Sequence, residues 1–228
     1  MTIRRVTKLV SIAEVAIGTY GAIQKSKELD AMLDIIVAEQ PHTIVEIGTR
    51  DGGTLYAICQ AAPDDALIIS MDTCWETYAL NVQLDNSKEF RDEFCKPGQN
   101  VRFLHADSHN QTTFQYLKNY LAGDPIDFLF LDGDHSYKGV KNDWETYSPL
   151  VRDGGIVGFH DIVTHEDQSL GCHVDLLWKE LKESGDYNLK EIICTDEEAY
   201  YETKVFRPIA YSLDWGGIGI VYISRGGE

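Results

Sequence analysis

Residues Thr43–Leu55 read TIVEIGTRDGGTL and contain the clearest indication of the fold. An apolar, β-branched run ends at Ile47, a turn follows with glycines at 48, 52 and 53, and a helical pattern begins at Thr54. A buried strand that turns through glycines into a helix is typical of the first unit of a parallel α/β sheet. The G-x-x-x-G-G spacing differs from the G-x-G-x-x-G of dinucleotide sites, and Glu46 and Asp51 add negative charge. This turn therefore favours a cationic ligand over a pyrophosphate.

The rest of the chain continues the alternation of strands and helices. We expect strands at Thr43–Ile47, Leu67–Met71, Val101–His105, Ile126–Leu131, Gly155–Phe159, Leu189–Cys194 and Ile218–Ile223. We expect helices at Lys25–Glu39, Thr54–Ala61, Asn86–Phe94, Thr112–Leu121, Lys138–Val151 and Leu170–Ser184. The last two strands lack a crossover helix between them, so they should pair antiparallel. The prediction is a Rossmann-like α/β fold, with a mostly parallel seven-stranded sheet and helices on both faces.

We predict one domain, residues 25–228, because no linker or repeat divides the chain. Residues 1–24 precede the alternation and are expected to form either an extra helix over the ligand crevice or an oligomer contact. The aromatic-rich segment 195–216 is expected to be a lid, an interface or an ordinary hairpin extension.

The overall charge restricts the partners of this protein. The chain of 228 residues has 20 Lys and Arg against 37 Asp and Glu, a formal net charge of −17. A nucleic-acid partner is not expected, because binding phosphates requires a cationic face. The five cysteines are scattered without a CxxC pair, which fits a reducing cytoplasm. No apolar run in the sequence is long enough to span a membrane.

Acidic residues follow the second and third expected strands at the edge where parallel sheets bind ligands. Asp72 ends the second strand and could accept both ribose hydroxyls of a nucleoside, while Asp107 and Ser108 follow the third and could contact an adenine edge. Singly, each would more often be a helix cap or turn residue. Together they predict a nucleoside site, and S-adenosylmethionine, which carries an ammonium and a sulfonium, matches the acidic first turn.

Two stretches, VEIGTRDGGTL and FLFLDGDHSYKGVKNDWETYSPLVRDGGIVGFHD, resemble class I S-adenosylmethionine-dependent methyltransferases. The similar subgroup includes macrolide-sugar and other natural-product O-methyltransferases and cephalosporin-hydroxylase-like proteins. The resemblance implies the strand order 3-2-1-4-5-7-6 with the seventh strand reversed. It places cofactor contacts on Glu46, Gly48, Asp72 and Asp107, and with their neighbours Thr49, Gly52, Gly53 and Ser108 these form the predicted cofactor site. Many class I enzymes have three spaced glycines in the first motif, whereas Thr49–Asp51 replace the middle one here.

A second site is expected where the fourth and fifth strands end. Asp132 follows one strand and His160 and Asp161 the other, so the three can meet at one edge and bind Mg²⁺ or another divalent cation. Such an ion would bind a substrate hydroxyl and lower its pKa. By the likeness to sugar O-methyltransferases, His135 is the candidate general base beside Asp132. The alternative is that Asp132, Asp134 and His135 only form a turn that caps the next helix.

The function predicted from the sequence is metal-assisted O-methylation of a hydroxyl on a small molecule, such as a sugar or natural-product moiety, with S-adenosylmethionine as the methyl donor. A cephalosporin-hydroxylase-like or other non-methylating relative is one alternative, and an NAD-dependent oxidoreductase is another. Neither nucleic acid nor a membrane is an expected partner, and a homo-oligomer is left open.

Overall fold

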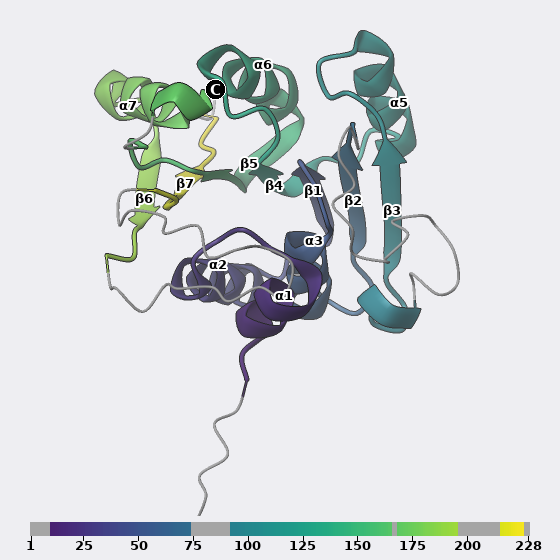
Figure 1. The fold of residues 1–228 in the computed structure, drawn as a ribbon. Coiled ribbons are helices and arrows are strands. Elements are labelled where there is room, and N and C mark those ends of the chain that lie inside the picture. Colours follow the sequence, from purple (N-terminus) through teal and green to yellow (C-terminus); the bar gives the residue numbers. More distant parts are fainter. Residues whose placement is uncertain (1–9, 74–91, 166–167, 196–214, 226–228) are drawn as a thin grey trace, which may run out of the picture.

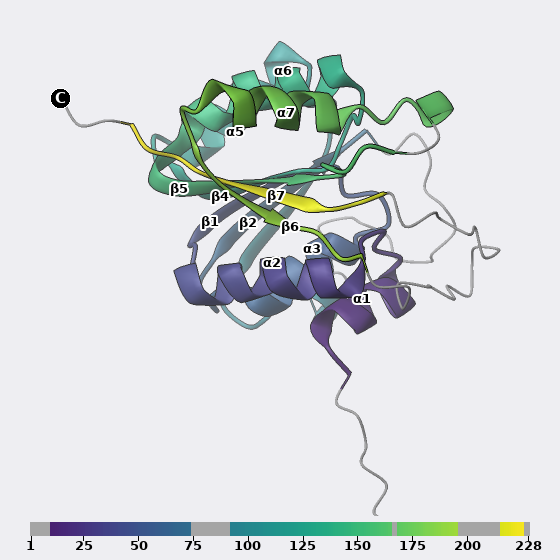
Figure 2. The same cartoon turned by 90° about the vertical axis from the view of Figure 1, so that its left-hand side faces the viewer.

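The computed structural model describes residues 10–73, 92–165, 168–195 and 215–225. A central sheet is covered by helices α1, α2 and α3 on one face and by α5, α6 and α7 on the other (Figures 1 and 2). The expected helix 86–94 lies mostly outside the described residues, and only 92–94 are seen to be helical. Within the described ranges, no helix has the length and apolarity of a membrane span.

The sheet has seven strands in the order β3-β2-β1-β4-β5-β7-β6, which confirms the predicted topology. The strands are β1 (Thr43–Ile47), β2 (Leu67–Asp72), β3 (Asn100–His105), β4 (Ile126–Leu131), β5 (Val151–His160), β6 (Asn188–Ile192) and β7 (Ile218–Tyr222). The first five run parallel, and β7 pairs antiparallel with both β5 and β6. The carboxyl ends of β1 to β5 therefore lie along one edge, where ligands of open parallel sheets bind.

The helices are α1 (Ile12–Tyr20), α2 (Ser26–Glu39), α3 (Gly53–Ala61), α5 (Gln111–Leu121), α6 (Tyr137–Tyr147) and α7 (Val174–Ser184). Side chains at three N-caps accept from backbone N–H groups: Ser11 for α1, Asn110 for α5 and Ser136 for α6. Each such cap satisfies a donor that has no partner within its helix.

Three predicted boundaries were wrong by four residues, and the others differ by at most two within the described residues. The helix expected over Lys138–Val151 ends at Tyr147, because Pro149 lies in a 3-10 turn, Ser148–Leu150. Strand β5 begins at Val151 instead of Gly155, with a register shift against β4 at its start. The helix expected from Leu170 begins at Val174, since Gly171 adopts a left-handed φ of +71°.

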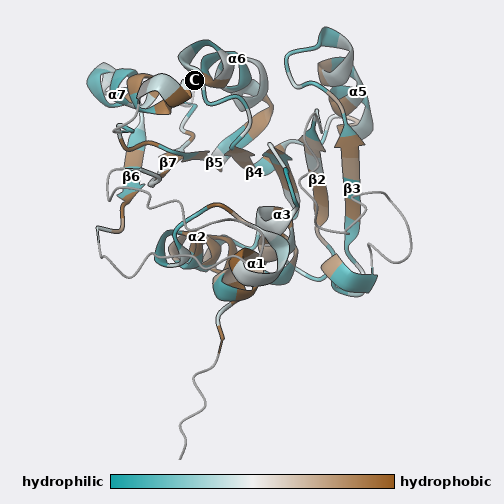
Figure 3. Ribbon diagram, in the orientation of Figure 1, coloured by the Kyte–Doolittle hydropathy of each residue, from teal (hydrophilic) through white to brown (hydrophobic). Residues whose placement is uncertain are grey.

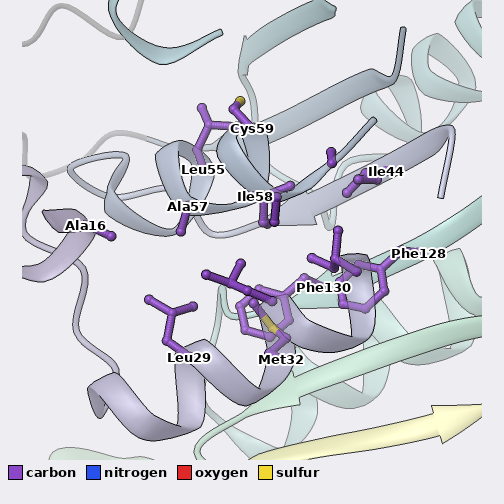
Figure 4. Packing of buried hydrophobic residues seen from close by; sticks show 14 of the residues in the cluster. Ala16, Leu29, Met32, Ile44, Leu55, Ala57, Ile58, Cys59, Phe128 and Phe130 are labelled. Atoms are coloured by element: carbon purple, nitrogen blue, oxygen red, sulfur yellow. The ribbon is translucent and has the colours of Figure 1, made fainter. Parts of the chain in front are cut away.

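The core consists of two apolar clusters, one on each face of the sheet. On the α1–α3 side, Leu29 and Met32 of α2 and Ile58 of α3 pack near Phe128 and Phe130 of β4 (Figure 4). On the α5–α7 side, Trp178 of α7 is 1% exposed and packs against Phe159 of β5. Hydrophobic residues are prominent along β2 and β3, and hydrophilic ones cover much of α5 to α7 (Figure 3). Because the central strands are buried on both faces, the polar residues at their carboxyl ends are held on a rigid base.

Candidate functional site

A cavity of about 550 Å³ lies at the carboxyl ends of β1 to β5. Its walls come from the turns that follow those strands, from residues 21–24 between α1 and α2, and from Trp215 just before β7. Small-molecule sites commonly have volumes of roughly 300–1,000 Å³, so this cavity is large enough for a nucleoside cofactor together with a small substrate.

The predicted cofactor residues divide between the cavity and the layer beneath it. Six of the eight line the cavity: Gly48, Thr49, Gly53, Asp72, Asp107 and Ser108. Glu46 and Gly52 are not part of the lining. Asp51 also lies outside the lining and is only 7% exposed.

Asp72 holds the first turn in place. Its Oδ2 accepts the backbone N–H of Thr49 at 2.8 Å and that of Arg50 at 2.7 Å. The carboxylate at the tip of β2 therefore orients the turn after β1, and it faces the cavity as well. Asp107 is similarly oriented, because its Oδ1 accepts the N–H of His109 at 2.8 Å.

Gly48 is required for close packing. Its φ is +93°, and a Cβ at this position would lie far inside contact distance of the Asp132 backbone carbonyl. Gly53 is similar, since a Cβ there would overlap the backbone of Ala22. These two glycines let the first turn approach β4 and the segment before α2, which brings the cavity walls together.

Glu46 lies beneath the cavity lining and contacts it through Ser70 and Thr49. Its side chain is 0% exposed and hydrogen-bonds Ser70 of β2, which in turn contacts the Thr49 hydroxyl. Burial raises the pKa of Glu46 to about 8, despite the Ser70 hydrogen bond, and the nearby Asp132 and Asp72 charges add to the rise. A carboxyl with this pKa is largely neutral at pH 7, and the contact between Glu46 and a cofactor stays a prediction.

Asp132, His135, His160 and Asp161, predicted to meet at the ends of β4 and β5, lie together at the cavity. His160 Nδ1 is 3.0 Å from Asp132 Oδ1 and 3.6 Å from Asp161 Oδ1. His135 Nδ1 is 2.7 Å from Asp161 Oδ2, and its Nε2 is 3.4 Å from Asp132 Oδ1. Two imidazoles therefore alternate with two carboxylates in one network.

Burial and pairing act in opposite directions on this network. Burial alone would lower the pKa of each histidine, but the carboxylates raise it, to about 9 for His160 and well above its usual value for His135. Burial would likewise raise the pKa of Asp132 and Asp161, but the facing imidazoles lower it. The network holds protons tightly and keeps both carboxylates ionised.

Helix capping does not account for this network. Ser136 caps α6 by accepting from Gly139, and Asp134 accepts the N–H of Ser136 at 2.9 Å. Asp132 and His135 instead contact residues of β5 and the loop after it, and both line the cavity. The capping alternative therefore explains Asp134 but not the two residues predicted to be catalytic.

Sequence reasoning missed two residues of the network. Gln24, which is 2% exposed, donates from Nε2 to Asp132 Oδ2 at 2.7 Å. Cys172 lies with its Sγ 3.7 Å from Asp161 Oδ2 and 3.9 Å from His135 Nδ1. His165, in the loop after β5, also lines the cavity.

The first turn of α2 connects the cavity wall to the start of β7. Lys25 and Glu28 are both buried, and Lys25 Nζ lies 5.4 Å from the centre of the Trp215 ring. Glu28 accepts the N–H of Cys194 at 2.7 Å and that of Gly217 at 2.9 Å. Apart from its two ends, the aromatic segment 195–216 lies outside the described residues.

A family profile described as a methyltransferase domain matches residues 45–162, more than half of the chain. The chain belongs to this methyltransferase family. The matched region begins in β1 and ends just after Asp161, so it contains the first turn and the four-residue network. The predicted resemblance to class I methyltransferases is confirmed.

Two curated relatives, both named as uncharacterised proteins, match part of this chain. A protein of Acanthamoeba polyphaga mimivirus is 35% identical over 119 residues, which are 52% of this chain and 51% of the relative. A protein of Sinorhizobium fredii is 28% identical over 151 residues, 64% of this chain but 16% of that protein. The chain thus spans about half the length of the first relative and a smaller share of the second.

Solved O-methyltransferase structures share the fold at low sequence identity. The Bacillus cereus O-methyltransferase bound to S-adenosylhomocysteine has a TM-score of 0.61 at 13% identity, covering 96% of this chain and 94% of that one. TomG of Streptomyces achromogenes, in complex with S-adenosylmethionine, has a TM-score of 0.59 at 16% identity, with 94% and 89% covered. CalS11, a TDP-rhamnose 3'-O-methyltransferase, has a TM-score of 0.53 at 20% identity, with 71% of each chain covered.

Proposed function

We propose that this methyltransferase transfers the methyl group of S-adenosylmethionine to a hydroxyl of a small molecule such as a sugar or natural-product moiety. The observation that carries the proposal is one continuous cavity that connects Asp72 and Asp107 with the network around Asp132 and His135. The part near Asp72 and Asp107 can hold a nucleoside, and the part near Asp132 and His135 can accept a proton from the substrate. The S-adenosyl ligands of TomG and the Bacillus enzyme and the sugar named for CalS11 are consistent with this division.

The part of the cavity lined by Asp72, Asp107 and Ser108 is the proposed cofactor site. Asp72 is already oriented by two backbone N–H groups, so it can accept a ribose hydroxyl without further ordering. Asp107 and Ser108 follow β3 on the same edge and are proposed to contact the adenine.

His135 is the proposed proton acceptor. The Nδ1–H of His135 donates to Asp161, as in other carboxylate–histidine pairs, and only the neutral imidazole has an Nε2 lone pair that can accept a proton. Because Asp132 and Asp161 raise the pKa of His135, this neutral form becomes more populated as the pH rises. The substrate hydroxyl loses its proton to Nε2, its oxygen forms the new bond to the methyl carbon, and the sulfur–methyl bond breaks to leave S-adenosylhomocysteine. Asp132 would orient the hydroxyl and stabilise the imidazolium that forms.

A divalent cation at Asp132, His160 and Asp161 remains part of the proposal, with magnesium as its first candidate. The fit to magnesium is incomplete, because one of these three ligands is an imidazole and both Asp132 oxygens already face other side chains. When bound, such an ion would supply charge that lowers the pKa of the substrate hydroxyl. No step above depends on it.

Calorimetry with S-adenosylmethionine and a methyl-transfer assay on a panel of hydroxylated sugars test the proposal. We expect cofactor binding by the wild type, and about 10²–10⁴-fold slower turnover in His135→Gln at nearly unchanged cofactor affinity. His42→Gln is a suitable control, since His42 is 63% exposed and lies with Asp65 at the surface. Failure of the folded protein to bind the cofactor, or full activity of His135→Gln, would disprove the assignment.

The same assay separates the alternatives. A product heavier by one oxygen atom, instead of by the one CH2 that methylation adds, would indicate a cephalosporin-hydroxylase-like reaction. Turnover that changes nicotinamide absorbance would indicate an oxidoreductase. The first turn disfavours the latter, because its glycine spacing does not match dinucleotide sites.

The cellular setting is also a proposal. We place the protein in the cytoplasm, acting on a small molecule without nucleic acid or a membrane as partner, which its acidic composition supports. A homo-oligomer is compatible with this setting.

A further inference from the structure

Three side chains of different chemistry converge beside Asp132: those of His135, Asp161 and Cys172. Their ligand atoms all lie within 4.8 Å of one another. We propose that this set binds a borderline transition-metal ion of the zinc class, with Cys172 as a thiolate ligand. The site shares Asp161 with the cation site expected from the sequence but uses different partners.

The fold brings the three ligands together from separate elements. His135 is in the turn after β4, Asp161 follows β5, and Cys172 precedes α7. The backbone N–H of His173 donates to the carbonyl of His135 at 2.7 Å, which fixes the Cys172 segment against the turn. Asp161 has a φ of +60°, which is uncommon for a residue other than glycine. Such strained positions cluster at ligand sites, where the surroundings hold them.

The surroundings also fit a metal-bound histidine. Histidine ligands usually donate their second ring N–H to a carboxylate, which fixes the ring. Here His135 Nδ1 faces the other two ligands, and Nε2 is 3.4 Å from Asp132 Oδ1. Asp132 is itself held by Gln24 at 2.7 Å and His160 at 3.0 Å. Asp132, itself oriented by two hydrogen bonds, can therefore accept the second ring N–H of the proposed ligand His135.

The donor atoms select the class of metal. Imidazole nitrogen, thiolate sulfur and one carboxylate oxygen suit zinc and similar ions, whereas magnesium prefers an octahedral shell of oxygens. Three protein ligands leave the fourth tetrahedral position open, as in catalytic zinc sites. His135 and Asp161 line the cavity, so a substrate hydroxyl could reach an ion held by them. Binding would release the Cys172 thiol proton and would make His135 a ligand instead of the proton acceptor.

The test is a titration of the full-length chain, freed of metal by a chelator, with Co²⁺ as a spectroscopic probe. We expect one Co²⁺ per chain and a thiolate-to-cobalt charge-transfer band in the near ultraviolet, lost on adding Zn²⁺ but kept in excess Mg²⁺. Cys172→Ser should abolish the band and weaken Co²⁺ binding at least about tenfold. Cys95→Ser is the control, because Cys95 packs against the core on the α1–α3 side and should leave the band unchanged.

A wild type without the band, a band that survives in Cys172→Ser, or displacement of Co²⁺ by equimolar Mg²⁺ would each overturn the proposal. Thermal melting of the metal-free variants confirms that they are folded. Should Cys172→Ser not fold, His135→Gln replaces it, and in that variant the loss of tight Co²⁺ binding is the expected result. Methyl transfer is not measured in this experiment, so failure of the metal site and failure of the proposed reaction can be told apart.

Discussion

Gln24 and Asp132 are 108 residues apart in the chain, yet Gln24 Nε2 donates to Asp132 Oδ2 at 2.7 Å. The other end of the same amide, Oε1, accepts the Thr54 hydroxyl at 2.9 Å. Gln24 thus connects the start of α3 with the end of β4. It lies between α1 and α2, before the first strand of the sheet. One buried amide orients a carboxylate that faces the proposed substrate.

Gln24→Ala should impair turnover more than cofactor binding. The substitution removes a hydrogen bond to a charged group, an interaction of about 1.5–3 kcal/mol, and leaves Asp132 Oδ2 without this donor. We expect kcat to fall about tenfold or more, with the S-adenosylmethionine dissociation constant changed less than about threefold. Steady-state kinetics and calorimetry measure the two effects. Gln115→Ala, at an exposed position of α5, should change neither, and equal losses in both for Gln24→Ala would contradict a positioning role.

Gly48→Ala should lower the free energy of unfolding for two reasons: the strain of a positive φ in alanine and the overlap of its Cβ with the Asp132 backbone. Gly48 and Gly123 have similar φ values, +93° and +100°, but a Cβ at Gly123 would meet nothing within 4 Å. The two alanine variants share the left-handed strain, and only Gly48→Ala adds the overlap with Asp132. We expect Gly48→Ala to lose about 1–3 kcal/mol more than Gly123→Ala in urea unfolding. Equal losses would show that the turn can move away from β4.

Asp72→Asn tests the proposed ribose contact. The amide oxygen can still accept the two backbone N–H groups, so the first turn should stay in place while the negative charge is lost. We expect about tenfold weaker S-adenosylmethionine binding, close to 1.4 kcal/mol, by calorimetry. Asp65→Asn, at a side chain that is 75% exposed, should bind as the wild type does. An unchanged affinity in Asp72→Asn would remove Asp72 from the cofactor site.

Glu46 should make the protein less stable as the pH rises. Its pKa is about 8 in the fold, above the ordinary value of 4.5, so the folded state binds more protons between these pH values. The stabilisation is therefore fully present below pH 4.5 and is lost as the pH rises through about 8, at up to about 1.4 kcal/mol per pH unit. Glu46→Gln, which stays neutral, should show a smaller decrease between pH 5 and pH 8 in chemical unfolding. Parallel stability curves for the two proteins would argue against a neutral Glu46.

Much of the architecture followed from local pattern. The apolar runs at Ile44 and Leu129 and the glycines after the first of them predicted β1, β4 and the turn between β1 and α3. The antiparallel pairing of the last strands followed from the missing crossover helix. Asp72, Asp107, Asp132 and Asp161 were found because the parallel topology brings strand ends to one edge, whatever the details of packing.

Contacts that depend on register or on distant segments could not be predicted in this way. Glu46 lies near the end of its strand, but the sequence does not show that its register partner is Ser70 or that both side chains are buried. Gln24 and Cys172 each lie two positions before a helix, in segments with no motif of their own. Only the three-dimensional path of those segments places the amide beside Asp132 and the thiol beside Asp161.

Glu28 has a consequence for how this enzyme could diversify. By accepting from both Cys194 and Gly217, a single buried carboxylate fixes the two points between which the chain leaves and rejoins the sheet. The free energy of closing the intervening stretch depends only weakly on its length. Insertions, deletions or wholesale exchange of that stretch should therefore leave β6 and β7 paired.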